Sequence, residues 1–262
     1  MDAKTQTVLI TGASGGIGYE LAKLFARDGY NLVLVARSAE KLNHVAAELR
    51  GKFGVGAETV VLDLTEDQAA RFLFDQLQSE GIAVDVLVNN AGFGEFGKFA
   101  EMGEEEILGQ IQLYVTVLTQ LTRLFLPAML GRRSGKIMNV ASTAAFQPGP
   151  MMAVYYATKA YVLSFTEAVA NEVAGAGVVV SCFCPGATFT DFAKRAGLEK
   201  SRLFKIGAMN VEVVAKDGYR GLMAGRTLVI SGARNWLVAE SVRLAPRKLV
   251  TAVSRWVTET AE

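Results

Sequence analysis

The stretch Thr11-Gly12-Ala13-Ser14-Gly15-Gly16-Ile17-Gly18 follows the apolar run Val8-Leu9-Ile10 and precedes a helix-like segment. A strand, a glycine turn and a helix in this order form a cradle for the pyrophosphate of a dinucleotide, because backbone amides at the helix start face the phosphates. Gly12 permits the sharp turn, and Gly16 and Gly18 permit close approach. The spacing G-x-x-x-G-x-G differs from G-x-G-x-x-G, since Leu21 occupies the place of the third glycine. A plain glycine-rich turn is the alternative, so the rest of the chain must decide.

Further motifs follow downstream in a fixed order. Asn89-Asn90-Ala91-Gly92 ends one apolar run, and Pro185-Gly186 ends another. Between them, Ser142 stands thirteen residues before Tyr155, and Lys159 follows Tyr155 by four positions. Together with the glycine turn, these motifs resemble the short-chain dehydrogenase/reductase family over roughly residues 5 to 232. The resemblance implies a nicotinamide cofactor and chemistry on a carbonyl/alcohol pair.

Length and periodicity predict the fold. With 262 residues, 51% of them hydrophobic, the chain can bury one substantial core. Alternating strand and helix patterns predict a single α/β domain over residues 1–262, a doubly wound, Rossmann-like parallel sheet with helices on both faces. We expect strands at 7–11, 31–36, 58–62, 85–89, 135–140, 178–184 and 227–230, and helices at 17–28, 40–50, 67–80, 104–130, 154–175 and 211–224. Thr65 with Gln68 resembles a capping box.

Charge and composition exclude several classes of function. The net charge of +1 gives no electrostatic case for nucleic acid. Met1 to Gln6 show no signal-peptide pattern, and Pro and Gly interrupt the uncharged runs, so we expect a cytoplasmic protein without a transmembrane segment. Cys182, Cys184 and the single His44 cannot make a four-ligand zinc site without carboxylates. We therefore expect no metal, and the remote His44 argues against a Ser-His-Asp triad.

The end of the second strand predicts the cofactor. An NAD site usually presents a carboxylate here, but the residues are Ala36-Arg37-Ser38. A guanidinium without a neighbouring acid suits the 2′-phosphate of NADP, although a solvated arginine is the alternative and Ser14 is not basic. The resemblance implies that Asp63 bonds the adenine amine and that Asn90 to Gly92 lie along the adenosine. The candidate cofactor-binding residues are Gly12, Ser14, Gly16, Ile17, Gly18, Arg37, Asp63, Asn90, Ala91, Gly92, Tyr155, Lys159, Pro185, Gly186, Thr188 and Thr190.

Tyr155 and Lys159 share one face of a helix. The pKa of a tyrosine, near 10, must fall by about 3 to suit pH 7, and one cation about 4 Å away supplies that at an effective dielectric of about 20. By resemblance, Lys159 also holds the nicotinamide ribose, Ser142 donates to the substrate oxygen, and Tyr155 gives or takes the proton. A core aromatic is the alternative role for Tyr155, but Tyr156 suits it better because no lysine follows it by four. Two other functions stay open: a 3-oxoacyl thioester reductase and a non-catalytic, cofactor-binding regulatory protein.

Tyr114 is a departure from the family pattern. The family normally carries an asparagine in this slot, which holds a water linking the lysine to solvent, whereas this chain reads Gln110-Ile-Gln-Leu-Tyr114. We expect the phenol hydroxyl to face the site within reach of such a water, and Tyr114→Asn to preserve or increase turnover. A space-filling helix residue is the alternative.

The substrate side is less defined. Residues 187–207 form a long connection that predicts a substrate lid. Apolar residues suit a lipophilic substrate: Phe93, Phe146, Met151, Met152, Phe189, Phe192, Leu198 and Leu203. In the C-terminal extension, 234–262, Leu249, Val250, Val253, Trp256 and Val257 repeat at helical spacing beside basic residues, which predicts packing on this or a neighbouring subunit or, alternatively, peripheral membrane contact. Apolar residues on several faces of helices 104–130 and 154–175 predict a homodimer or homotetramer.

Overall fold

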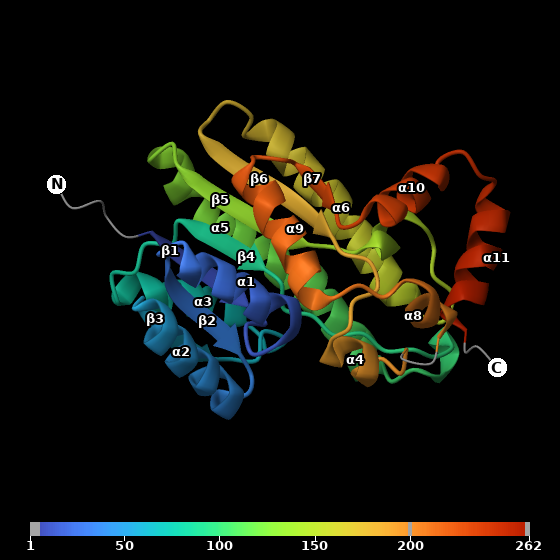
Figure 1. Ribbon diagram of the computed structural model, residues 1–262, viewed down its shortest axis with the longest axis horizontal. Coiled ribbons are helices and arrows are strands. Elements are labelled where there is room, and N and C mark those ends of the chain that lie inside the picture. Colours follow the sequence, from blue (N-terminus) through green and yellow to red (C-terminus); the bar gives the residue numbers. More distant parts are fainter. Residues whose placement is uncertain (1–5, 199–200, 260–262) are drawn as a thin grey trace.

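The computed structural model describes residues 6–198 and 201–259. Its centre is a parallel seven-stranded sheet in the order β3-β2-β1-β4-β5-β6-β7 (Figure 1). The strands are β1 (Thr7–Thr11), β2 (Asn31–Ala36), β3 (Ala57–Val61), β4 (Val86–Asn89), β5 (Gly135–Val140), β6 (Val178–Cys184) and β7 (Leu228–Ile230). The strand order reverses beside β1, so the carboxyl ends of β1 and β4 flank the crevice where doubly wound sheets bind ligands. The predicted fold class is confirmed.

Helices cover both faces of the sheet. One face carries α1 (Gly16–Arg27), α2 (Ala39–Phe53) and α9 (Val211–Met223). The other carries α3 (Ala69–Ser79), α5 (Leu118–Gly131) and α6 (Ala153–Glu172). Alternate residues of each strand serve opposite cores: Val8 and Ile10 face the first set of helices and Leu9 faces the second.

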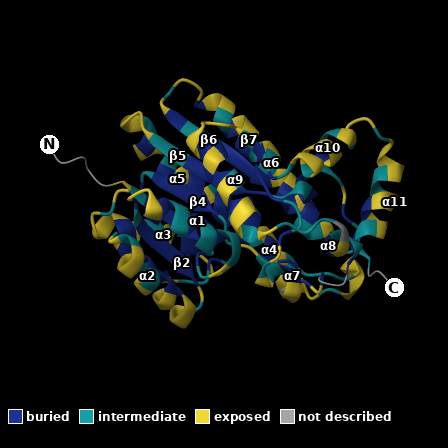
Figure 2. Cartoon of the chain, in the orientation of Figure 1, coloured by how far each residue is buried: buried dark blue, intermediate teal, exposed yellow. Residues whose placement is uncertain are grey.

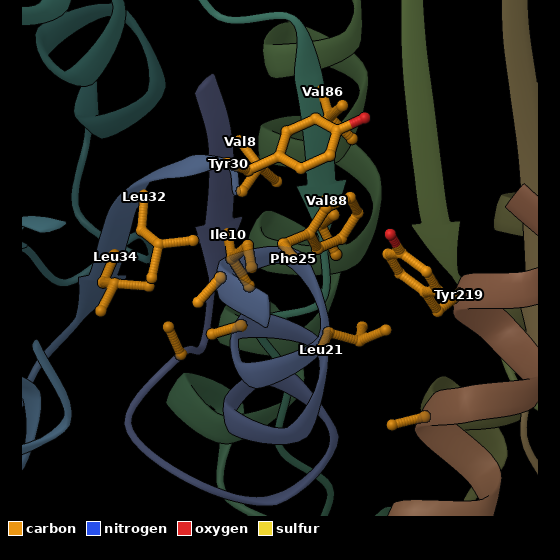
Figure 3. Packing of buried hydrophobic residues seen from close by; sticks show 14 of the residues in the cluster. Val8, Ile10, Leu21, Phe25, Tyr30, Leu32, Leu34, Val86, Val88 and Tyr219 are labelled. Atoms are coloured by element: carbon orange, nitrogen blue, oxygen red, sulfur yellow. The ribbon is translucent and has the colours of Figure 1, made fainter. Parts of the chain in front are cut away.

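Aromatic packing joins helix α1 to helix α9. Phe25 on α1 meets Tyr30 and Tyr219 edge-to-face, with ring centroids 5.2 and 4.9 Å apart (Figure 3). Tyr219 lies on α9, so residues nearly two hundred positions apart share one core.

The predicted helix 104–130 is divided in the structure. It consists of α4 (Glu104–Ile111), a π-helical turn η2 (Gln112–Val117) and α5. The stretch Glu104–Gly131 is long and apolar enough to cross a membrane by length and composition. Leu113, Val117 and Leu121 of this stretch pack against the sheet, as expected of a core helix.

The capping box predicted at Thr65 and Gln68 is wrong. Asp63 competes for the same groups: its carboxylate accepts bonds from the Thr65 amide at 2.9 Å and the Thr65 hydroxyl at 2.7 Å. Helix α3 therefore begins later, after Gln68 in a left-handed conformation.

Short helices gather at one end of the sheet. They are η1 (Phe99–Glu101), η3 (Thr143–Phe146), α7 (Asp191–Arg195), α8 (Arg202–Gly207), α10 (Ala233–Ser241) and α11 (Arg247–Thr258). Figure 1 shows α10 and α11 extending away from the sheet, and α11 returns to lie beside α8. Figure 2 shows that this arm has much more exposed surface than the buried sheet.

Candidate active site

A cavity of about 970 Å³ opens where the strands end. It runs from the glycine turn, past the ends of β2, β4 and β5, to the C-terminal helix α11. Its lining includes these sequence-predicted residues: Gly12, Ser14, Gly16, Ile17, Arg37, Asp63, Asn90, Ala91, Gly92, Tyr114, Ser142, Tyr155, Lys159, Pro185, Gly186, Thr188 and Thr190. Gly18 does not line the cavity, because it packs beneath the turn.

The glycine turn leaves its backbone open to the cavity. Gly12 and Gly16 have φ angles of +68° and +56°, which favour glycine. A Cβ on Gly18 would collide with the Gly12 carbonyl oxygen and with Nδ2 of Asn90, whereas a Cβ on Gly15 would meet nothing within 4 Å. The first turn of α1 therefore presents amides to an anion without side-chain obstruction.

Asn90 holds this turn in place. Its Nδ2 donates to the carbonyl oxygens of Thr11 and Gly12 at 2.9 and 3.2 Å. In return, Oγ1 of Thr11 accepts bonds from the amides of Asn90 and Ala91 at 2.9 and 3.0 Å. Sequence reasoning missed Thr11, although its position at the strand end beside the first glycine was a usable signal.

Arg37 and Asp63 lie at the outer end of the cavity. Nη1 of Arg37 is 3.4 Å from Oδ2 of Asp63, and the two side chains are 60% and 32% exposed. Burial opposes ionisation of Asp63, but the bonds from Thr65 and the nearby Arg37 outweigh it and lower the pKa of this carboxyl. The guanidinium keeps further N–H donors directed to solvent, where an anion can reach them.

Ser142, Tyr155 and Lys159 meet in the middle of the cavity. Ser142 caps η3 by accepting a bond from the Ala144 amide at 3.1 Å. One turn of α6 separates Tyr155 from Lys159, whose Nζ donates to the Val140 carbonyl at 2.8 Å. The chain thus places an acid, a hydroxyl donor and a cation around one volume.

The electrostatics of this cluster differ from the sequence-based expectation. Burial raises the pKa of Tyr155, although the neighbouring Ser142 hydroxyl lowers it. Burial also lowers the pKa of Lys159 to about 7, against weaker opposing effects from Cys182 and Cys184. The expectation that Lys159 alone brings the pKa of Tyr155 down by about 3 took no account of desolvation, which penalises the charged forms of both groups.

Tyr114 is oriented differently from the prediction. Its hydroxyl donates to the carbonyl oxygen of Phe93 at 2.7 Å. The ring, rather than the hydroxyl, faces the lysine: Nζ of Lys159 lies 3.8 Å from the ring centroid. The sequence pattern could identify the slot but not the direction of the hydroxyl.

The inner end of the cavity is largely apolar. Phe93, Met152, Phe192, Leu198 and Leu203 line it as predicted. Three other predicted residues do not: Phe146 packs in a separate cluster, Phe189 is exposed and Met151 lies outside the lining.

Helix α11 forms one wall of the cavity. Its apolar residues line the cavity: Leu249, Val250, Val253, Trp256 and Val257. The same helix adds a polar group, Ser254, and the loop after η3 adds Gln147; neither was anticipated from the sequence. Leu249, Val253 and Trp256 are nevertheless more than half exposed, so packing on this subunit covers the apolar face of α11 only in part.

Comparisons with known proteins agree with this geometry. The family model for short chain dehydrogenases matches residues 6–201. The chain belongs to the short-chain dehydrogenase family. It is 34% identical over 178 residues to a very-long-chain 3-oxoacyl-CoA reductase of Phaeosphaeria nodorum, covering 66% of this chain and 52% of the relative. The chain therefore spans about half the length of that reductase.

Solved short-chain dehydrogenases share the whole fold. One from Sphingobium yanoikuyae in complex with NADPH is 33% identical, with a TM-score of 0.81 over 91% of this chain and 94% of the other. A 7beta-hydroxysteroid dehydrogenase is 27% identical, with a TM-score of 0.86 over 95% and 96% of the two chains. The Sphingobium structure holds NADPH, and the likeness to both dehydrogenases extends over more than nine tenths of this chain.

The residues present fit such a cofactor. The backbone at Gly15 leaves room for a phosphate, since a Cβ there would meet nothing within 4 Å, and the left-handed Gly12 and Gly16 set the path of the turn. Arg37 and Asp63 would serve the adenosine end of a dinucleotide, and Tyr155 and Lys159, which line the same cavity, would serve its nicotinamide end.

Proposed function

We propose that this short-chain dehydrogenase transfers a hydride between NADP(H) and a lipophilic carbonyl/alcohol substrate. The observation that carries the proposal is one continuous cavity in which Ser142, Tyr155 and Lys159 separate a glycine-lined end from an apolar end. That arrangement lets a cofactor and an apolar substrate meet at the catalytic cluster.

Arg37 supports NADP over NAD. The residues at the end of β2 offer a guanidinium and no carboxylate for a ribose 2′-hydroxyl. Asp63 partly neutralises Arg37, yet the arginine remains well exposed and holds donors for a phosphate. The complex of the Sphingobium relative with NADPH points in the same direction.

Each residue has a distinct task in the proposed reaction. When bound, the cofactor supplies or accepts the hydride. Ser142 donates a hydrogen bond to the substrate oxygen, where charge develops, and Tyr155 donates its proton to that oxygen during reduction. Lys159 holds the nicotinamide ribose and places positive charge beside Tyr155. Apolar side chains around the substrate exclude water and strengthen these interactions.

The lipophilic substrate class rests on the inner wall. Helices α6, α7, α8 and α11 each contribute apolar side chains to the cavity lining, among them Tyr156, Phe192, Leu203 and Val250. The relatives named for long acyl chains and a steroid act on substrates of this character. A 3-oxoacyl thioester is the second candidate, favoured by the match to the 3-oxoacyl-CoA reductase and by the basic Arg234 in the cavity lining.

We also propose that the protein is cytoplasmic and forms a homodimer or homotetramer. Residues 187–207 are proposed to act as the substrate lid, and residues 199 and 200 of that segment lie outside the described residues. Exposed Leu108 and Ile111 on the α4–α5 stretch and Tyr161 on α6 support self-association. Light scattering after gel filtration tests the assembly, and a monomer at micromolar concentration would contradict it.

The decisive experiment is turnover of NADPH against a panel of bulky ketones, short ketones, aldehydes and 3-oxoacyl thioesters. We expect oxidation of NADPH with lipophilic ketones, and a preference for thioesters would select the second candidate. Tight cofactor binding without turnover of any panel member would instead support the non-catalytic regulatory role.

A further inference from the structure

The ammonium group of Lys159 lies deep in the protein with few polar partners. The residue is 4% exposed, and its Nζ donates to the Val140 carbonyl on β5. The titratable groups around it are Tyr155 on α6, Tyr114 on η2, and the thiols of Cys182 and Cys184 on β6. Within residues 6–198 and 201–259, no carboxylate forms a salt bridge with Lys159. A charged lysine therefore needs another source of stabilisation here.

The ring of Tyr114 lies where that source is needed. Nζ of Lys159 is 3.8 Å from the Tyr114 ring centroid, compared with 5.6 Å from the centroid of Tyr155. Cations are attracted to aromatic faces within about 6 Å, and the attraction strengthens when water is excluded. Tyr114 is 2% exposed, so little water screens the contact.

The surroundings of Tyr114 fix its ring in this position. The Tyr114 hydroxyl donates to Phe93 O at 2.7 Å, and the Tyr114 and Tyr155 rings meet edge-to-face with centroids 5.9 Å apart. Gly92 leaves room for the hydroxyl, because a Cβ there would collide with it. The π-helical turn η2 carries Tyr114, and such turns are often found at functional positions.

Tyr114 does not act as an acid or base itself. Burial raises its pKa well above the usual value, so the phenol stays neutral, and its proton is committed to Phe93 O. Only the ring face is available to Lys159.

We propose that Tyr114 is a positioning residue whose ring face holds the Lys159 ammonium charged and in place, a task that an asparagine amide in this slot would leave undone. The task of Lys159 rests on the proposed function, whereas the contact between ring and ammonium does not.

The test is a pH titration of Lys159 in the full chain. It is monitored by NMR of protein labelled with carbon-13 at lysine Cε. Lys159→Met identifies the Lys159 signal by its disappearance. Because a cation–π contact favours the charged form, Tyr114→Leu is expected to lower the pKa of Lys159 by about 1 relative to the unaltered protein. Tyr114→Phe keeps the ring and loses only the hydroxyl, so it is expected to leave that pKa within about 0.3.

A matched control separates this effect from general loss of packing. Phe125→Leu removes another buried ring from the same helical stretch, which packs against Phe74 and does not line the cavity, and is expected to leave the pKa of Lys159 unchanged. If Tyr114→Leu does not fold, phenylalanine analogues with one, two and three ring fluorines at position 114 replace it. They keep the ring shape and weaken its negative face, so the pKa of Lys159 is expected to fall with each added fluorine.

An unchanged pKa of Lys159 in Tyr114→Leu or across the fluorinated series would overturn the proposal. So would a fall in Tyr114→Phe as large as in Tyr114→Leu, which would assign the effect to the hydroxyl. This titration needs no substrate, so it can succeed even if the NADPH panel refutes the proposed reaction, and it can fail while turnover is observed.

Discussion

At the scale of single residues, Tyr155 decides whether the site is catalytic. Tyr155→Phe removes the proposed proton donor and keeps the ring that packs against Tyr114 and Phe192. We expect turnover to fall by about 10²- to 10⁴-fold with NADPH affinity nearly unchanged, as is usual for a positioned general acid. Single-turnover kinetics and fluorescence titration measure the two quantities.

The adjacent tyrosine provides the control for this prediction. Tyr156→Phe removes a hydroxyl that lies beside Ser254 and should change turnover by less than about tenfold. Full activity in Tyr155→Phe would transfer the role of acid to another group in the cavity.

Charge reversal at Arg37 tests its proposed role in the choice between NADP and NAD. Arg37→Asp places a second carboxylate beside Asp63, and the repulsion should raise the dissociation constant of NADPH by about 100-fold or more. NADH lacks the 2′-phosphate and should lose far less affinity. Calorimetry with both cofactors checks this, with Arg37→Met as the control for loss of the positive charge without an added carboxylate. Equal or tighter binding of NADH by the unaltered chain would refute the assignment to NADP.

At the scale of elements, two glycines of the turn between β1 and α1 have different tasks. Gly18 supports the fold, whereas Gly15 lies where we expect the cofactor to bind. A methyl group at Gly18 would meet the Gly12 carbonyl and Asn90, so Gly18→Ala should destabilise the fold by about 1–3 kcal/mol. Each kcal/mol corresponds to roughly 2–4 °C in Tm for a domain of this size. Gly15→Ala meets nothing within the protein and should keep the Tm within about 1 °C.

The two glycine variants are then compared for NADPH binding. A methyl at position 15 extends into the cavity, so weaker binding by a fully stable Gly15→Ala protein would place the phosphates at this turn. Equal Tm values for the two variants would contradict the tight packing of Gly18.

We expect helix α11 to contribute to the binding of large substrates. Trp256 and Trp236 are similarly exposed, 53% and 51%, but only Trp256 lines the main cavity. Trp256→Ala should raise KM for bulky ketones by roughly tenfold, from the apolar contact that it loses, and leave short ketones nearly unaffected. Trp236→Ala should change neither value. Equal effects of both variants would mean that α11 acts through stability alone.

Much of this arrangement could be predicted from the sequence. The limits of β1, β2, β5 and β6 matched the prediction because runs of Val, Leu and Ile are buried on both faces. The residues at the carboxyl ends of the strands were predicted to meet because parallel strands share one edge. Fixed spacing on a helix then placed Tyr155 beside Lys159.

The remainder depended on contacts between distant residues. The direction of the Tyr114 hydroxyl depends on the Phe93 carbonyl, and the pKa values of Tyr155 and Lys159 depend on burial. Asp63 accepts hydrogen bonds from the amide and hydroxyl of Thr65, the groups that the predicted capping box required. None of these competitions is visible in local sequence patterns.

At the scale of the whole molecule, the carboxylate of Asp28 links two helices that are far apart in the sequence, α1 and α9. Oδ2 of Asp28, after α1, accepts a bond from the Tyr219 hydroxyl of α9 at 2.5 Å, and Oδ1 accepts one from Arg27 at 2.9 Å. Arg27 and then Tyr219 lower the pKa of Asp28 below 3.8. Because the folded chain favours the ionised form, this contribution is present above pH 4 and is lost as the pH falls through the lowered value.

Asp28→Asn should therefore lower the Tm by about 2 °C at pH 7, with a smaller difference near pH 3. Calorimetry at both values tests this, and Tyr219→Phe serves as the partner in a double-mutant cycle. A difference that grows on acidification would contradict the sign of the linkage.

The two cysteines on β6 give a route to unknown ligands. Cys182 and Cys184 are 0% exposed, their sulfur atoms lie 3.7 Å apart, and the chain has no other cysteine. A thiol-reactive dye can reach them only after the sheet opens, so the labelling rate reports how readily the sheet opens. Any compound that binds the closed form lowers this labelling rate by mass action. Libraries of ketones and alcohols can thus be screened by protection from alkylation before any reaction is known.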